Sequence, residues 1–142
     1  MHMTHKDSIL LKTLRKEHTS RPPVWFMRQA GRILPRYLAL KEKYTFREMM
    51  ENPKIAAEVT LMPITDLGVD AAILFSDILV IPNEMGMHLD FIKGEGPIFK
   101  DPIVTEADVD GLLGGEAAAD KLTYVYETIK LLKEQLPQDK AL

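Results

Sequence analysis

Two short, continuous apolar runs, each followed at once by polar residues, constrain the fold of this chain most strongly. Val24–Met27 leads directly into Arg28 and Gln29, and Ala71–Phe75 leads into Ser76-Asp77. Uninterrupted apolar runs of this length are typical of strands buried on both faces, as in parallel sheets. Helical patterns separate the runs, so the sequence predicts parallel βα construction in an α/β fold. In such folds functional groups gather beyond the C-terminal ends of the strands.

Capping residues place the predicted helices and turns. Ser8 precedes an apolar spacing that predicts a helix to about His18, and Asn52-Pro53 opens a longer helix to about Leu67 that Gly68 ends. The other predicted elements are a helix from Arg36 to Tyr44, a hairpin of His88–Ile92 and Pro97–Phe99, a short helix begun by the capping-box pattern Thr105–Asp108, and an amphipathic helix at Ala117–Leu136. The chain stops at Lys140–Leu142, where an α/β pattern calls for its next strand.

The charge of the chain is divided unevenly along its length. The net charge of -3 conceals a segment of residues 21–54 with eight basic and three acidic residues, followed by residues 55–142 with six basic and sixteen acidic ones. All six arginines lie in the first third of the chain. Guanidinium suits bidentate contacts to carboxylate or phosphate, so this third is a candidate anion-binding region. A solvated basic face explains the same charges, and charge alone favours that reading.

Several functional classes are excluded or disfavoured. The chain has no cysteine, which removes disulfides, thiolate metal sites and a cysteine nucleophile from this stretch. It has no phosphate loop, no serine elbow and no aromatic-basic surface for nucleic acid. The longest apolar run, Val69–Leu74, is too short to span a membrane, and the N-terminus does not resemble a signal peptide. We therefore expect a cytoplasmic protein without nucleic-acid or membrane partners, in which residues 1–7 are disordered.

Arg28 and Arg32 are the strongest candidates for binding an anion. They stand four apart around Gly31, directly after the first apolar run. If the stretch is a turn rather than a helix, glycine lets the backbone bend while both guanidinium groups face one pocket. Gln29 adds an amide to such a site. The competing interpretation pairs one arginine with an acidic side chain or carbonyl groups of the fold, at about even odds.

Asp77 is the second candidate, because it follows five apolar residues at the end of the second run. A desolvated carboxylate there can stabilise positive charge that develops in a substrate. Capping a short helix is the commoner use of Ser-Asp at such a place, and without further information it is favoured. His18 and His88 have no second ligand at metal spacing, so neither indicates a metal site.

The run Pro23–Arg32, followed by Leu34-Pro35, resembles the N-terminal signature of the uroporphyrinogen decarboxylase family. Phe75–Pro82, Met85-Gly86-Met87 and Gly94–Pro97 resemble the next blocks of that family in the same order. The resemblance covers about residues 8–136, and its first motif is highly specific. The chain departs from the family pattern at Ile33, usually aromatic, and at Lys41, often arginine, which weakens the case for a third substrate-binding guanidinium.

The resemblance implies a (β/α)8 barrel of the TIM type, of which this chain is only the N-terminal portion. Such a barrel needs about 250 residues, and only two clear barrel strands are found here. Open edges then predict poor stability or association of the isolated piece. The family acts without metal or organic cofactor and is normally homodimeric.

The implied activity is removal of carbon dioxide from the four acetate side chains of uroporphyrinogen III, which gives coproporphyrinogen III in haem biosynthesis. By resemblance, Asp77 and Arg28 are catalytic, and the substrate is bound by Arg28, Gln29, Ala30, Gly31, Arg32 and Asp77. Two alternatives stay open at this stage. One is a related barrel methyltransferase that uses zinc to move a methyl group between a corrinoid and a thiol, and the other is a non-catalytic tetrapyrrole-binding fragment.

Overall fold

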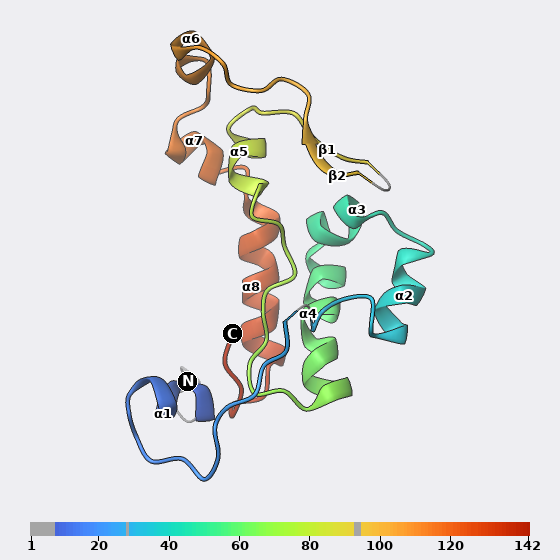
Figure 1. Cartoon of the computed structure of the whole chain (residues 1–142), viewed down its shortest axis with the longest axis vertical. Helices are drawn as coiled ribbons and strands as arrows, with labels where there is room; N and C mark the ends of the chain where they lie inside the picture. Colours follow the sequence, from blue (N-terminus) through green and yellow to red (C-terminus); the bar gives the residue numbers. More distant parts are fainter. Residues whose placement is uncertain (1–7, 28, 93–94) are drawn as a thin grey trace.

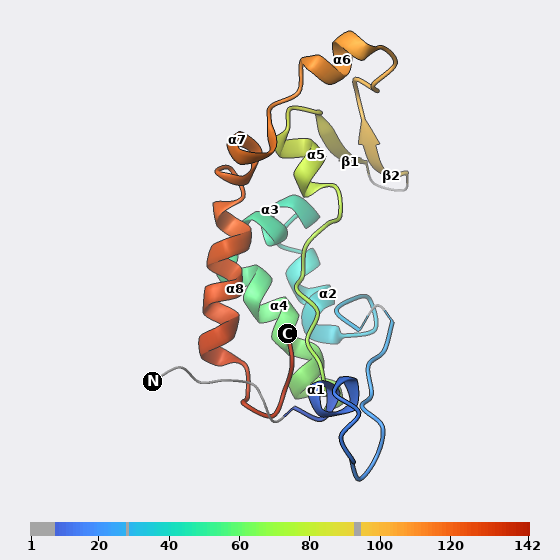
Figure 2. The same cartoon turned by 90° about the vertical axis from the view of Figure 1, so that its left-hand side faces the viewer.

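The computed structural model describes residues 8–27, 29–92 and 95–142, so the expected disorder of residues 1–7 lies outside the described residues. Helices α4 and α8 lie side by side, with the hairpin and α5 to α7 at one end of the molecule and α1 at the other (Figure 1, Figure 2). The elements are α1 (Ile9–Leu14), α2 (Pro35–Lys41), α3 (Phe46–Glu51), α4 (Pro53–Leu67), α5 (Val80–Glu84), β1 (Leu89–Ile92), β2 (Gly96–Phe99), α6 (Glu106–Asp110), α7 (Gly115–Ala119) and α8 (Thr123–Gln135).

Helix α4 has the ends that its sequence predicts. The Asn52 side chain accepts hydrogen bonds from the backbone N–H groups of Lys54 and Ile55, at 3.1 and 3.4 Å. Pro53 occupies the first turn, where its missing N–H costs nothing. Gly68 closes the helix with a φ of 69°, a left-handed conformation that glycine adopts without a Cβ penalty. Local signals alone therefore define this helix.

The core forms where α4 packs against α8, α2 and α3. Met49, Val59 and Met62 are at most 1% exposed, and α8 turns Leu132 inward. Thr60 joins α4 to the extended segment that follows it, because its hydroxyl accepts a hydrogen bond from Phe75 N at 2.8 Å and donates one to Ala56 O at 2.7 Å. The helical layer thus fixes the position of the second apolar run.

The two predicted strands are extended segments rather than continuous strands, so the strand prediction is wrong in that respect. Residues 22–26 form no ladder, and the second run contributes a single parallel bridge, Ala71 with Ala141. Backbone N–H of Asp70 nevertheless donates to Val24 O at 2.9 Å, and Ala72 N donates to Ala141 O at 2.8 Å. Each parallel strand needs partners along its whole length, and the described chain supplies contacts only near the start of each segment.

Several helix boundaries also differ from the prediction. Helix α1 ends at Leu14 rather than His18 because Lys16 takes a left-handed φ of 61°. The helix expected at Ala117–Leu136 divides into α7 and α8, and the break lets Leu122 enter the core, where it is 9% exposed. The helix predicted from Arg36 runs only to Lys41, and a capping box of Thr45 starts α3. None of the helices in the described ranges is long and apolar enough to cross a membrane.

The hairpin and the short helix after it agree with the sequence. Strands β1 and β2 pair antiparallel, with Leu89 opposite Phe99 and Ile92 opposite Gly96. Thr105 and Asp108 form the predicted capping box at the start of α6. Lys93 and Gly94, which were expected in the turn, lie outside the described residues.

Asp70 joins the starts of three extended segments. Its carboxylate accepts two hydrogen bonds from the guanidinium of Arg21, at 2.6 and 2.8 Å, and one from Val24 N at 2.8 Å. Lys140 Nζ lies 3.5 Å from the same carboxylate. Asp70 is only 2% exposed, whereas the Arg21 side chain is 52% exposed. Hydrogen bonds from Arg21 hold the pKa of Asp70 well below its usual value, against the opposing effect of burial.

Replacing Asp70 with asparagine is expected to lower the free energy of unfolding by about 2 kcal/mol at pH 7, because a buried charge-assisted network is lost. The native-state pKa lies below the ordinary value of 3.8, so this contribution is complete above that value and disappears as the carboxylate is protonated. The difference between the two proteins should therefore shrink as the pH falls from about 5 to about 2. Urea unfolding followed by Trp25 fluorescence measures it.

The exposed Asp110 supplies the matched control, since Asp110→Asn should leave the unfolding free energy unchanged within about 0.5 kcal/mol. A difference between Asp70→Asn and the unsubstituted chain that is constant from pH 7 to the acid limit would contradict the assigned role of the carboxylate.

Candidate functional site

A cavity of about 250 Å³ lies where the two predicted site motifs meet. Gln29 and Ala30 reach it from the segment after the first apolar run, and Ser76 reaches it from the end of the second. The complete lining is Trp25, Gln29, Ala30, Tyr37, Phe46, Ile73, Leu74, Phe75 and Ser76. The fold thus brings together two polar stretches that are more than forty residues apart in the sequence.

Gln29 joins the two extended segments beside this cavity through hydrogen bonds of its side chain. Its side chain is buried, and its Nε2 donates to Ala71 O at 2.8 Å while its Oε1 accepts from Phe26 N at 3.2 Å. Both ends of the amide are therefore engaged within the chain. The expected role of Gln29 in binding substrate stays a prediction, and the observed geometry gives it a positioning role between the two extended segments.

The stretch that carries Arg32 is a turn, which is the condition that the anion-site hypothesis set. Residues 29–33 are not helical, and Leu34 N donates to Gly31 O at 3.0 Å. Buried Leu34 anchors the turn just before α2, and Arg32 is exposed beside it. Arg28, the other expected cation, lies outside the described residues. Ala30 lines the cavity, whereas Gly31 and Arg32, which follow it in the sequence, are not among the lining residues.

Asp77 follows the cavity residue Ser76 directly and is partly buried. Its Oδ1 accepts a hydrogen bond from Leu79 N at 2.8 Å, which is a turn contact between residues two apart. The expectation that Asp77 caps a short helix is wrong, because Leu79 is the N-cap residue of α5 and no side chain caps that helix. The Oδ2 atom of Asp77 has no hydrogen bond to the described part of the chain. The turn contact and a ligand-binding role are therefore compatible, because each uses a different carboxylate oxygen.

Aromatic rings form much of the cavity wall. Tyr37 meets Phe75 edge to face at 5.8 Å between ring centres, and Phe46 meets Phe75 in the same way at 5.3 Å. Phe46 also packs against Phe91 of the hairpin at 4.9 Å. The sequence interpretation missed Tyr37 and Phe46 as wall residues. The three-residue spacing between Leu34 and Tyr37 was the available signal, since it puts both on one face of a helix.

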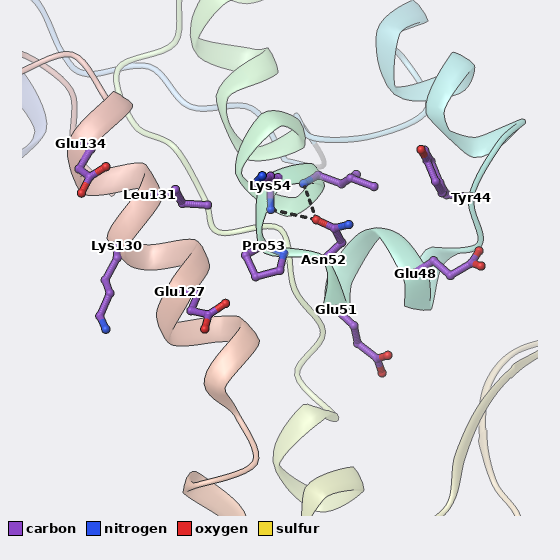
Figure 3. Close-up of a pocket in the computed structure, with 11 residues that line it drawn as sticks. Tyr44, Glu48, Glu51, Asn52, Pro53, Lys54, Glu127, Lys130, Leu131 and Glu134 are labelled. Atoms are coloured by element: carbon purple, nitrogen blue, oxygen red, sulfur yellow. Dashed lines mark hydrogen bonds between the residues drawn. The ribbon is translucent and has the colours of Figure 1, made fainter.

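A second, larger cavity of about 910 Å³ lies between α8 and the junction of α3 and α4 (Figure 3). None of the predicted site residues lines it. Glutamates outnumber lysines on its walls: Glu48, Glu51, Glu127 and Glu134 stand against Lys54 and Lys130. Such a charge balance opposes a polyanionic ligand. The smaller cavity is therefore the better candidate for the site that the sequence indicates, despite its size.

No group of three or more His, Cys, Asp or Glu side chains within residues 8–27, 29–92 and 95–142 is arranged to hold a metal ion. His88 instead lies 3.2 Å from Asp101 at the surface. The expectation of a reaction without metal or cofactor stays a prediction.

Comparison with known proteins gives one consistent family. Residues 5–142 match the family model described as Uroporphyrinogen decarboxylase (URO-D). Proteins named uroporphyrinogen decarboxylase from Aliarcobacter butzleri and Sulfurovum sp. are 67% identical over 137 residues and 63% identical over 127 residues. The matches cover 96% and 89% of this chain but only 40% and 37% of the relatives. The chain thus spans about two fifths of the length of these relatives.

Replacing Gln29 with leucine is expected to lower the free energy of unfolding by about 2 kcal/mol, because Phe26 N and Ala71 O both lose their buried partner. Urea unfolding at neutral pH measures the change. Gln135→Leu, at the exposed last residue of α8, is the matched control and should shift stability by less than about 0.5 kcal/mol. Equal stability of the two variants would show that Gln29 does not brace the site.

Proposed function

The chain belongs to the uroporphyrinogen decarboxylase family, and on that basis we propose that it is the N-terminal portion of a (β/α)8 barrel that decarboxylates uroporphyrinogen III. The barrel enzyme removes carbon dioxide from all four acetate side chains and yields coproporphyrinogen III for haem biosynthesis. The match over residues 5–142 carries this proposal. It favours the decarboxylase over the methyltransferase. The proposal includes a cytoplasmic, homodimeric enzyme without metal or organic cofactor.

The contacts between extended segments support the barrel. Asp70 bonds to Val24 on one side and the backbone at Ala71 and Ala72 meets Ala141 on the other, which is the order expected for consecutive parallel strands. Apolar side chains on these segments remain uncovered, with Trp25 44% and Ile73 49% exposed. The remainder of the barrel would cover them, since (β/α)8 barrels fill their interior with side chains from all strands.

The chemistry requires a place for the electrons that a departing carboxylate leaves behind. Protonation of a pyrrole on a ring carbon makes the ring cationic, and the electron pair of the breaking carbon–carbon bond then flows into it as carbon dioxide leaves. Protonation of the resulting methylene group and loss of the proton first added to the ring carbon then restore the pyrrole with a methyl group, so one proton is consumed for each carbon dioxide released. The site therefore needs an anion beside the pyrrole N–H groups, a proton source and cations for the remaining carboxylates.

The described residues provide for these needs in part. Asp77 has one carboxylate oxygen available to accept hydrogen bonds from pyrrole N–H groups and to stabilise the cation. Exposed Arg32 is available to a substrate carboxylate. Arg28, which lies outside the described residues, is assigned the same role by resemblance to the family, together with a part in proton transfer. Guanidinium has a pKa above 12, so binding is the primary role of Arg28, and a water oriented by it serves equally well as proton donor.

A chimera tests the proposed function directly. This chain replaces the matching 40% of the Aliarcobacter butzleri relative, and the loss of carboxyl groups from uroporphyrinogen is followed anaerobically. We expect decarboxylation by the chimera and a loss of at least about a hundredfold in kcat with Asp77→Asn, because the anion that stabilises the cationic ring is removed. Asp110→Asn in α6 is the control and should retain the parent rate. A folded but inactive chimera would refute the proposal, and near-normal turnover by Asp77→Asn would remove Asp77 from the mechanism.

Arg32→Ala in the same chimera is expected to raise KM for uroporphyrinogen by about tenfold or more while kcat changes much less. A contact made equally in the ground state and the transition state has this effect. The comparison variant is Arg36→Ala, since Arg36 is also an exposed arginine near α2 but pairs with Glu58 and Asp66 at 3.5 and 3.1 Å. Steady-state kinetics of both variants measure the difference. A pure loss of kcat in Arg32→Ala with unchanged KM contradicts a binding role.

A further inference from the structure

Tyr37 is a buried tyrosine on the wall of the smaller cavity, in the first turn of α2. We propose that its hydroxyl donates a hydrogen bond to a substrate carboxylate that Arg32 also holds, so that the two residues form a subsite for one acidic arm of the tetrapyrrole. This inference rests on the proposed function and deepens it, because it assigns a specific contact to a residue outside the arginine motif.

The size of the cavity decides what it can receive. Sites that enclose a whole drug-sized ligand have volumes of about 300–1,000 Å³, whereas this cavity measures about 250 Å³. It is therefore too small for a tetrapyrrole macrocycle and large enough for one carboxylate side chain. Its walls are mostly aromatic and aliphatic, and Ser76 and Gln29 contribute the other polar side chains. Gln29 already uses both ends of its amide within the chain.

The ring of Tyr37 is held in place while its hydroxyl is left without a partner. The residue is 7% exposed, and its ring packs edge to face against Phe75, which Phe46 supports from another side. Among residues 8–27, 29–92 and 95–142, no group forms a hydrogen bond with the Tyr37 hydroxyl. The hydroxyl oxygen is not among the fully buried polar atoms, so it reaches accessible space beside the cavity, where a ligand or water can bond to it. A fixed ring with an unsatisfied hydroxyl is preorganised for a ligand.

Electrostatics indicate which kind of ligand fits. Burial raises the pKa of Tyr37, while the positive charge of Arg32 acts on the phenol in the opposite direction. The phenol thus stays protonated at neutral pH and is available as a donor, and Arg32 is near enough to influence it. A neutral donor beside a guanidinium suits an anion with several acceptor oxygens, as a carboxylate has.

Tyr124 provides a matched comparison within the same core. Its hydroxyl has no hydrogen-bond partner in the described ranges either, but it is fully buried, and burial with the nearby charges of Glu84 and Glu51 raises its pKa to about 12. It does not line the smaller cavity. Removing the two hydroxyl groups therefore distinguishes a contact with substrate from the general effect of a buried tyrosine.

The experiment compares Tyr37→Phe and Tyr124→Phe in the chimera, since both changes keep the ring. Tyr37→Phe should raise KM for uroporphyrinogen about tenfold and leave kcat within about twofold, because the hydrogen bond to the carboxylate is present before and during the reaction. Tyr124→Phe should change neither constant. In the double variant Tyr37→Phe with Arg32→Ala, the rise in KM should be smaller than the product of the two single rises, as expected for residues that share one carboxylate.

Binding of oxidised uroporphyrin, followed by its own absorbance, gives a second measurement that does not need turnover. Tyr37→Phe should weaken it about tenfold, and Tyr124→Phe should not. An active chimera in which Tyr37→Phe leaves KM and uroporphyrin affinity unchanged overturns the subsite alone, as does a loss of kcat at constant KM. A chimera that neither decarboxylates uroporphyrinogen nor binds uroporphyrin refutes the proposed function and the subsite together, whereas binding weakened by Tyr37→Phe without turnover supports the subsite only.

Discussion

The buried carboxylate of Asp70 is the contact on which the arrangement of the extended segments depends. It joins Arg21 and Val24, near the start of the first apolar run, to the start of the second run, and Lys140 approaches it from the third segment. The backbone of Asp70 adds bonds to Val24 and Ala141. Three stretches from distant parts of the sequence are thus brought to one place although continuous ladders are absent between them. Charge-assisted hydrogen bonds to Asp70 therefore hold the three segments together, a role that backbone pairing fills in a completed sheet.

The position of the candidate site follows from this anchoring. Because the segments leave Asp70 side by side, Gln29 and Ser76 reach the same cavity at their far ends. The hydrogen bond from Gln29 Nε2 to Ala71 O joins the same two segments a second time, one residue beyond Asp70. From the cavity, Phe75, Phe46 and Phe91 continue as contacting rings to the hairpin. The hairpin is therefore physically linked to the cavity wall through α3, where Arg47 also donates to Leu89 O.

Features fixed by nearby residues were predictable, and those fixed by distant partners were not. Asn52 and Gly68 define α4 through backbone groups within a few residues, and Thr105 does the same for α6. The apolar runs identified the extended segments, but continuous strands depend on neighbours that no local pattern supplies. Likewise, the pairing of Arg21 with Asp70 joins residues 49 apart in the sequence. The sequence left open whether the stretch around Gly31 is a turn or a helix, and the structure has a turn at residues 29–33. The hydrogen bonds of Gln29 within the chain depend on the distant Ala71 carbonyl and could not be predicted.

The folded chain shows which partners the clustered arginines have. Arg21 pairs with Asp70, Arg36 with Glu58 and Asp66, and Arg47 with Glu51. These three cations of the basic segment are therefore paired with acidic groups of the chain and do not form a continuous anion-binding face. Arg32 forms no ion pair with any residue that the structure describes. Pairing with acidic groups of the fold thus accounts for three of the five arginines in residues 21–54. The anion-binding interpretation is therefore restricted to the turn that carries Arg32. In the proposed subsite, Arg32 and the small aromatic cavity bind one carboxylate, so the other acidic arms of the proposed substrate would need cations from the rest of the proposed barrel.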